Sequence, residues 1–399
     1  MTHPTEQAVL DLISVDQIVA DTVDLIAARS ENPGDVEART VAVLQAMCER
    51  IGAAVELQEV APHRTNLHAS IGPADAPGIL FLGHSDVVPA GDGWTGDPFN
   101  PRVQSGTIIG RGATDMKGGL AAVVAAMEAV STRHPEIRVE LLCTVDEEDQ
   151  ALGVVKALEN LEGRSLLACI VAEPTNLDIV IGCRGATNLQ IDILGKSAHA
   201  GRPEDGASSI YAASLIVEKI RQMHQTARSG ANDPLLGGPS WNVGTITGGT
   251  GTSMVPQATS ITIDRRMMPG EQPEGILSDL LAVLRNELAQ SDIANAPLLA
   301  LTGKVMLDMP GFKTNGDLEL PRVAQGALET VGTQSPLTGW TAACEGGFVA
   351  RATDAPTIIL GPGDINNQAH QPDESVAIAD LVTAAQAYAL LALRLNHVT

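Results

Sequence analysis

The sequence predicts an α/β protein with a central mixed, mostly parallel sheet flanked by helices, into which a smaller α+β domain is inserted. Runs of aliphatic residues with the length of buried strands occur at Ile79–Gly83, Ile137–Val145, Leu166–Ala172 and Thr357–Leu360. Residues 185–299 interrupt this series with a different pattern. With 399 residues and 44% hydrophobic content, the chain can form two folded domains.

The larger domain is expected to comprise residues 1–184 and 300–399. It opens with two helices, Asp16–Arg29 and Val36–Ile51, and two short strands, 54–59 and 65–71; further helices are predicted at Leu120–Val130 and Ala151–Leu161. Within 185–299, a strand (Gly185–Gly195), a helix (Ser208–Met223), two strands (Trp241–Gly248, Ser260–Met267) and a second helix (Gly275–Leu288) follow in turn. This order indicates a small α+β domain.

Composition narrows the classes of partner. The net charge of −23 opposes binding to nucleic acid or to an anionic membrane surface. The five cysteines are scattered without C-x-x-C spacing and are expected to be reduced core residues. The polar N-terminus and the lack of an eighteen-residue apolar run predict a cytoplasmic protein without a membrane span.

Metal-binding residue types follow the predicted strands. His84 and Asp86 come directly after one strand, Glu147 and Glu148 after the next, and Glu173 after the third; His370 lies beyond the fourth. In open α/β sheets, ligands collect at the carboxyl ends of the strands. Mixed imidazole and carboxylate ligands suit one or two divalent ions of the zinc type. Alone, the acidic run Asp146–Asp149 would also fit a solvated turn before a helix N-terminus.

A glycine-rich segment, Gly110–Gly119, has the appearance of a phosphate-binding loop, but its spacing excludes that function. A dinucleotide fingerprint requires glycine where Asp115 stands, and a P-loop requires Ser or Thr after Lys117. A carboxylate in this loop would repel phosphate, so Asp115 joins the candidate metal ligands.

These residues carry a resemblance to a known family. The chain resembles the M20 metallo-aminoacylases and metallopeptidases along nearly its whole length, and within them the acetylornithine deacetylase and succinyl-diaminopimelate desuccinylase branch, with a lean toward the deacetylase. The segments that carry the resemblance are Gly83–Asp86, Gly110–Gly119, Asp146–Glu148, Glu173–Thr175, Gly361–Asn366 and Ala369–Glu374. The resemblance implies a zinc-exopeptidase-like fold in which residues 185–299 form a dimerisation and lid domain.

The resemblance also implies a site with two metal ions, expected to be Zn²⁺, with Co²⁺ or Mn²⁺ as alternatives. One ion would be bound by His84, Asp115 and Glu173, and the other by Asp115, Glu148 and His370, with a cis peptide bond after the bridging Asp115. Asp86 would fix the tautomer of His84. Divalent ions lower the pKa of water, and Glu147 would act as the general base.

Further residues are implied to bind the substrate or the transition state. His199 would reach the active site from the partner subunit of a homodimer and stabilise the developing oxyanion. Arg184 and Arg265 would contact the substrate carboxylate, with ordinary ion pairing as the equally weighted alternative. Ser253 stands where relatives carry Asn, and Glu345 lies in a segment that lines the substrate pocket.

The predicted function is hydrolysis of the amide bond of a small N-acyl amino acid, first of all in the manner of an acetylornithine deacetylase. A succinyl-diaminopimelate desuccinylase, or an M20 dipeptidase or carboxypeptidase, would use the same residues. A catalytically silent metal-binding protein is the alternative from another class. It would be expected to have lost the base or a ligand, and all six of these residues are present.

Overall fold

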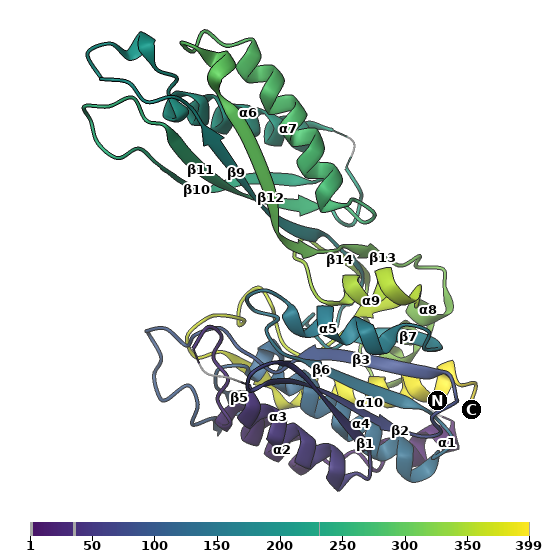
Figure 1. Ribbon diagram of the computed structural model, residues 1–399. Helices are drawn as coiled ribbons and strands as arrows, with labels where there is room; N and C mark the ends of the chain where they lie inside the picture. Colours follow the sequence, from purple (N-terminus) through teal and green to yellow (C-terminus); the bar gives the residue numbers. More distant parts are fainter. Residues whose placement is uncertain (1–2, 35–36, 231, 399) are drawn as a thin grey trace. The chain divides into compact units, whose positions relative to one another are not determined.

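The computed structural model describes residues 3–34, 37–230 and 232–398. Two compact units divide the chain (Figure 1). The first contains Met1–Gly182, Lys313–Gly339 and Glu345–Thr399, and the second contains Cys183–Phe312 and Trp340–Cys344. The first residue of the predicted helix Val36–Ile51 lies outside the described residues, and the helix observed there begins at Ala38.

A nine-stranded mixed sheet organises the first unit, as the sequence predicted. Its order is β1-β2-β6-β3-β7-β15-β8-β13, with β14 also paired to β8. Strands β6, β3, β7 and β15 are parallel, whereas β1, β2 and β8 join by antiparallel pairing. The strands are β1 (Ala54–Ala61), β2 (Arg64–Ile71), β3 (Gly78–His84), β6 (Val139–Thr144), β7 (Leu166–Val171), β8 (Ile179–Cys183), β13 (Phe312–Lys313), β14 (Leu337–Trp340) and β15 (Thr357–Ile359).

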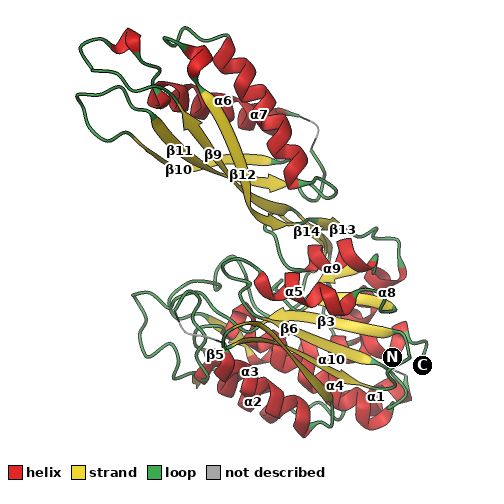
Figure 2. Ribbon diagram, viewed as in Figure 1, coloured by secondary structure: helices red, strands yellow, loops and turns green. Residues whose placement is uncertain are grey.

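Helices cover both faces of this sheet (Figure 2). α4 and α10 pack together on one face, and α5 and α9 lie on the other. The helices are α1 (Pro4–Leu10), α2 (Val15–Ala27), α3 (Ala38–Arg50), α4 (Gly118–Arg133), α5 (Leu152–Leu161), α8 (Glu319–Thr330), α9 (Gly346–Thr353) and α10 (Ile378–Leu395); a small second sheet contains β4 (Arg102–Gln104), β5 (Thr107–Ile109) and β16 (Ser375–Ala377).

Helix α4 approaches the sheet closely because it begins with glycine. A Cβ atom on Gly119 would lie 2.4 Å from the carbonyl oxygen of Ala172, so a side chain there would push the helix away from the sheet. The next turns are rich in small residues, and all of Gly118–Met127 is buried. This packing brings the segment before the helix, which contains Asp115, against the strand ends.

Helix α10 is the one helix among the described residues with the length and apolar composition of a membrane span. Most of this helix is buried inside the first unit, against α4 and α8. A buried core helix meets the same criteria of length and composition as a membrane span. All five cysteines are also buried thiols, as predicted.

The second unit is an antiparallel sheet of order β10-β11-β9-β12, with two helices packed against it. Its elements are β9 (Gly185–Leu194), α6 (Ser209–Ser229), β10 (Ser240–Gly248), β11 (Ala258–Met267), α7 (Pro273–Ala289) and β12 (Ala300–Met309). Buried and more exposed residues alternate along β9 and β11. The buried Ile and Leu side chains of these strands form a core with the apolar faces of α6 and α7.

The end predicted for the inserted segment, residue 299, excludes one strand of this sheet. β12 pairs with β9 from Ala300 to Met309, and the compact unit continues to Phe312. This strand was not predicted from the sequence. Its pairing partner, β9, lies more than a hundred residues earlier in the chain, and the local hydrophobic pattern contains no information about such distant pairing.

Replacement of Tyr388 by Phe should destabilise the first unit. The buried hydroxyl of Tyr388 donates a hydrogen bond of 2.7 Å to the carbonyl of Leu360, and its ring lies 4.9 Å from that of Phe81. Loss of the hydroxyl removes the hydrogen-bond donor to a buried carbonyl. The free energy of unfolding, measured with urea, should fall by about 1–3 kcal/mol. Tyr211→Phe is the matched control, because this side chain is 68% exposed. Equal unfolding free energies for the two variants would contradict the prediction.

Candidate metal centre

The predicted ligands of the metal centre converge at one edge of the large sheet. β6, β3 and β7 are adjacent and parallel, so that His84, the acidic run after β6, and Glu173 after β7 emerge on the same side. Asp115 lies in the kinked segment Ala113–Lys117 before α4, where its own backbone angles are not helical, and His370 lies in the loop between β15 and β16. The peptide bond after Asp115 is cis, as the resemblance implied.

Asp115 lies between the two histidines. Its Oδ1 is 3.2 Å from Nε2 of His84, and its Oδ2 is 3.3 Å from Nε2 of His370. Nε2 of His84 also lies 3.4 Å from Oε1 of Glu173, and Nε2 of His370 lies 3.4 Å from Oε1 of Glu148. The five side chains therefore form two groups, each with one histidine and one glutamate, that share one aspartate.

The chemistry of this donor set fits divalent metal ions. Candidate ligand atoms of His84, Asp115 and Glu148 all lie within 4.8 Å of one another. Oε1 of Glu148 is buried and accepts no hydrogen bond. Three adjacent carboxylates repel one another unless positive charge lies between them, and mixed nitrogen and oxygen ligands suit ions of the zinc type.

Without an ion, protons must compensate this charge. Burial disfavours the imidazolium of His84, but Glu173, Asp115 and Asp86 outweigh it and raise its pKa well above the usual value. The adjacent carboxylates of Asp115 and Glu148 raise the pKa of His370 to about 10. Burial raises the pKa of Asp115, yet the two histidines lower it overall. Burial, followed by the charge of Asp115, raises the pKa of Glu173 to about 7.

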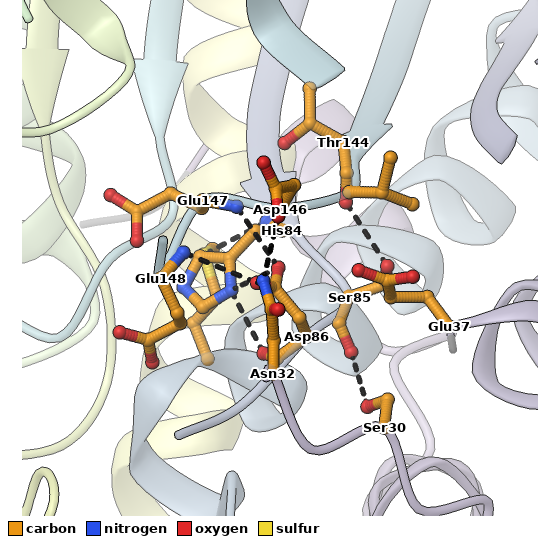
Figure 3. A network of polar contacts seen from close by, with 12 residues as sticks. Ser30, Asn32, Glu37, His84, Ser85, Asp86, Thr144, Asp146, Glu147 and Glu148 are labelled. Atoms are coloured by element: carbon orange, nitrogen blue, oxygen red, sulfur yellow. Dashed lines mark hydrogen bonds and ion pairs between the residues drawn. The ribbon is translucent and has the colours of Figure 1, made fainter. Parts of the chain in front are cut away.

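Asp86 holds His84 and the acidic loop together (Figure 3). The Nδ1 of His84 lies 3.0 Å from the backbone carbonyl of Asp86 and 3.5 Å from its carboxylate. A carbonyl can only accept a hydrogen bond, so this contact places the proton on Nδ1 and leaves Nε2 for a metal ion. The Asp86 carboxylate accepts hydrogen bonds from the backbone N–H groups of Glu147 (3.2 Å) and Glu148 (3.1 Å).

Glu374 links the other two loops of the site. Its Oε1 accepts hydrogen bonds from the backbone N–H groups of Thr114 (2.9 Å) and Asp115 (3.0 Å), and its Oε2 lies 2.7 Å from the buried guanidinium of Arg111. Glu374 is four residues beyond His370. The position of the shared aspartate is thus tied to the loop that carries the second histidine.

Two glutamates beside the cluster have raised pKa values. Burial, together with the charges of Glu148, Glu173 and Glu345, raises the pKa of Glu147 well above its usual value, against a lowering effect of His84. Burial raises the pKa of Glu345 to about 8; its Oε2 accepts a 2.5 Å hydrogen bond from the hydroxyl of Thr144, and its buried Oε1 has no partner. A poised carboxylate next to metal ligands is suited to proton transfer.

The other predicted site residues belong to the second unit. His199 is exposed, and its Nδ1 accepts from the N–H of Gly201; its strand-like segment pairs with that of Ser253 and Met254. Arg265 forms an ion pair with Glu271 and lies over the ring of Trp241.

The guanidinium of Arg184 donates to the carbonyls of Thr341 and Gly238. The ion pair of Arg265 matches the ordinary alternative given for it. Catalytic or substrate-binding roles for His199, Ser253, Arg184 and Arg265 stay predictions.

Sequence reasoning assigned no role to several residues that surround the ligands. Arg111 and Glu374 stood inside recognised motifs, and Asn32 lies between the two predicted opening helices, Asp16–Arg29 and Val36–Ile51. Arg64 gave no signal, because it is the first residue of an otherwise ordinary strand. Their contacts join segments up to 263 residues apart, and no local pattern records such contacts.

An α/β sheet whose edge gathers two histidines and two glutamates around a shared aspartate is typical of a metal-dependent hydrolase. Comparison with protein families supports this class, since residues 80–394 match the model of peptidase family M20/M25/M40. The chain belongs to this family and is a metallo-hydrolase that acts on amide bonds.

Curated relatives share its length. The chain is 33% identical to the succinyl-diaminopimelate desuccinylase of Acinetobacter baylyi over 341 residues. The alignment covers 81% of this chain and 84% of the relative. The desuccinylase of Methylobacillus flagellatus is 30% identical over 380 residues, covering 92% of this chain and 96% of the relative. The predicted family is confirmed; the lean toward acetylornithine deacetylase gains no support from these relatives.

Solved structures share the fold. A metallo-carboxypeptidase of the M20 family from Sulfolobus solfataricus superposes with a TM-score of 0.75 at 19% identity, covering 96% of this chain and all of the other. A dinuclear metal binding peptidase of the same family from Bacillus subtilis gives 0.71 at 17% identity, covering 95% of this chain and 98% of the other.

Binding of metal ions at neutral pH should release protons. Because their pKa values are raised, both histidines are expected to be positively charged imidazolium groups at about pH 7 in the metal-free protein. A histidine that binds a metal ion must be neutral, so each must lose one proton when the metal binds. Calorimetric titration in two buffers of different ionisation enthalpy should therefore report a net release of protons, from the two histidines and in part from Glu173. Apparent affinity should rise with pH.

His370→Gln should release fewer protons, and the control His397→Gln, which alters an exposed histidine at the C-terminal end, should behave as wild type. Identical heats in both buffers would show that the histidines are already neutral before the metal binds.

Proposed function

We propose that the protein hydrolyses the amide bond of a small N-acyl amino acid with two divalent ions, of which Zn²⁺ is the first candidate. The observation that carries the proposal is the placement of Asp115, whose two carboxylate oxygens face two different histidines, each accompanied by its own glutamate. His84, Asp115 and Glu173 would hold one ion, and Asp115, Glu148 and His370 the other.

Glu147 is proposed as the residue that moves the proton. Bound ions would supply Lewis acidity, which lowers the pKa of water and polarises the amide carbonyl. Glu147 precedes a ligand in sequence, and its backbone is held by Asp86, so that its carboxylate stays beside the cluster. It would accept the proton of the attacking water and then donate it to the leaving amine.

We propose an N-succinyl diamino acid as the first substrate to test, because both curated relatives described above are named for that activity. An N-acetyl amino acid is the second candidate, because the sequence resemblance leans toward acetylornithine deacetylase through the segments Gly361–Asn366 and Ala369–Glu374. A dipeptide is the third, since solved relatives of this fold include peptidases.

The substrate class can be tested with a panel of three compounds: N-succinyl-diaminopimelate, N-acetylornithine and an unmodified dipeptide. The purified protein would be loaded with Zn²⁺ or Co²⁺, and release of free amine would be measured as kcat/KM. The proposal expects the succinyl compound to be the best of the three. Preference for the acetyl compound would correct the acyl group only, and absence of amine from every compound would overturn the substrate class.

Glu147→Gln should lower kcat by about 10²–10⁴-fold while metal content is unchanged, because the variant loses the proton acceptor but no ligand. Asp149→Asn is the matched control: it neutralises an exposed carboxylate of the same acidic run. Metal content by atomic spectroscopy accompanies the kinetics. Comparable kcat values for the two variants would remove Glu147 from the role of base.

We further propose that the protein is a homodimer in which His199 serves the active site of the partner subunit. His199→Ala and Glu147→Gln would each be inactive alone, but mixed dimers of the two would contain one intact site and regain activity. Light scattering would measure the oligomeric state. A monomer, or mixtures with no recovery of activity, would contradict this arrangement.

A further inference from the structure

Asn32 is a buried amide side chain behind the metal centre, in the turn that ends helix α2. Its backbone N–H donates to the carbonyl of Val87, which fixes the turn beside the loop that follows β3. The Nδ2 group donates to Oδ2 of Asp86 (2.8 Å) and to Oδ1 of Asp146 (3.0 Å), and Oδ1 accepts from Arg64 (2.8 Å). Both hydrogens and the oxygen of this amide are therefore used.

The two carboxylates that Asn32 joins control different parts of the site. Asp86 contacts the ring of His84 and accepts the backbone N–H groups of Glu147 and Glu148. Asp146 directly precedes Glu147; it has a left-handed backbone with φ of 68° and a side chain that is fully buried. Asn32 thus connects the loop after β3 with the loop after β6 through side chains alone.

Arg64 supplies the positive charge of this arrangement. Its guanidinium forms an ion pair with Asp146, donates to Asn32, and lies 3.2 Å from a carboxylate oxygen of Glu37. Three buried carboxylates, those of Asp86, Asp146 and Glu37, surround the Asn32 amide and the guanidinium. Without these donors, the carboxylates would repel one another and be poorly solvated, which would separate the two loops.

We propose that Asn32, supported by Arg64, is a positioning residue that sets the location of Glu147 and Glu148 relative to His84. It touches neither substrate nor metal; it acts by holding Asp86 and Asp146 at a fixed separation (Figure 3). The inference rests on the proposed function for its kinetic test. Groups that orient metal ligands change metal affinity or activity by about 10–100-fold when they are removed.

The position requires an amide. Only Asn or Gln offers two N–H donors and one acceptor on one group, and Gln is longer by a methylene in a fully enclosed site. Aspartate has the same shape but no donor, and it would add another carboxylate to the cluster. Alanine would remove one hydrogen-bond donor from each of the carboxylates of Asp86 and Asp146, so the loops that carry them would be held less firmly.

The test compares Asn32→Ala and Asn32→Asp with Ser30→Ala. Ser30 is equally buried in the same turn, and its hydroxyl donates to the carbonyl of Ser85 at 2.6 Å without touching either carboxylate. At saturating metal, the Asn32 variants should lose about 10–100-fold in kcat with KM within about threefold of wild type, and Ser30→Ala should keep kcat within about threefold. Arg64→Lys, which retains charge but not the forked geometry, should be intermediate.

Affinity for Co²⁺, followed by its visible absorption, gives a readout that needs no substrate. Asn32→Ala should bind Co²⁺ about tenfold more weakly than Ser30→Ala, because His84 and Glu148 lose their common support. Thermal unfolding identifies a variant that does not fold. If Asn32→Ala does not fold, the comparison with Ser30→Ala is made with Asn32→Asp, which keeps the shape of the side chain.

Two results would overturn the proposal: Asn32 and Ser30 variants that behave alike in kcat and in Co²⁺ affinity, or an Asn32 variant that changes only in KM or melting temperature. A weakened Co²⁺ affinity with no cleavage of any panel compound would support the role of Asn32 and overturn the substrate class instead.

Discussion

The shared carboxylate of Asp115 is the interaction on which the site depends. It can face two histidines only because its loop is held against the sheet by the glycine start of α4 and by Glu374, which accepts two backbone hydrogen bonds from that loop. Glu374 is in turn paired with the buried Arg111. A carboxylate placed with this accuracy can link two cation sites, whereas a mobile one would bind a single ion weakly.

Concentration of negative charge at one sheet edge is costly, and the first unit meets this cost in two ways. At the front, the imidazoles of His84 and His370 face the candidate ligand carboxylates. Behind them, backbone N–H groups, the Asn32 amide and the Arg64 guanidinium satisfy the carboxylates that bind no metal. Buried carboxylates remain ionised only where such donors are available. The donors behind the cluster are therefore needed to keep the carboxylates in front of them charged and in place.

Much of this arrangement was predictable from local patterns. Aliphatic runs followed by His84, Glu147 and Glu173 predicted both the strands and the edge at which their ends meet, because parallel strands deliver the residues after them to the same side. The end of the inserted segment was predicted too early, since β12 is recognisable chiefly by its pairing with β9. The roles of Asn32 and Arg64 were missed for a similar reason: each acts on residues more than fifty positions away.

The sequence by itself determined the family, the mixed sheet and the residue types that can hold metal, because these follow from strand periodicity and from motifs that are contiguous in the chain. Only the tertiary structure decided which atoms face one another: that Asp115 divides its oxygens between two histidines, that His84 donates to a backbone carbonyl, and that Asn32 joins two buried carboxylates. The physical reason is that a hydrogen bond depends on distance and direction in space, and chain folding sets both after the sequence has fixed only the partners available.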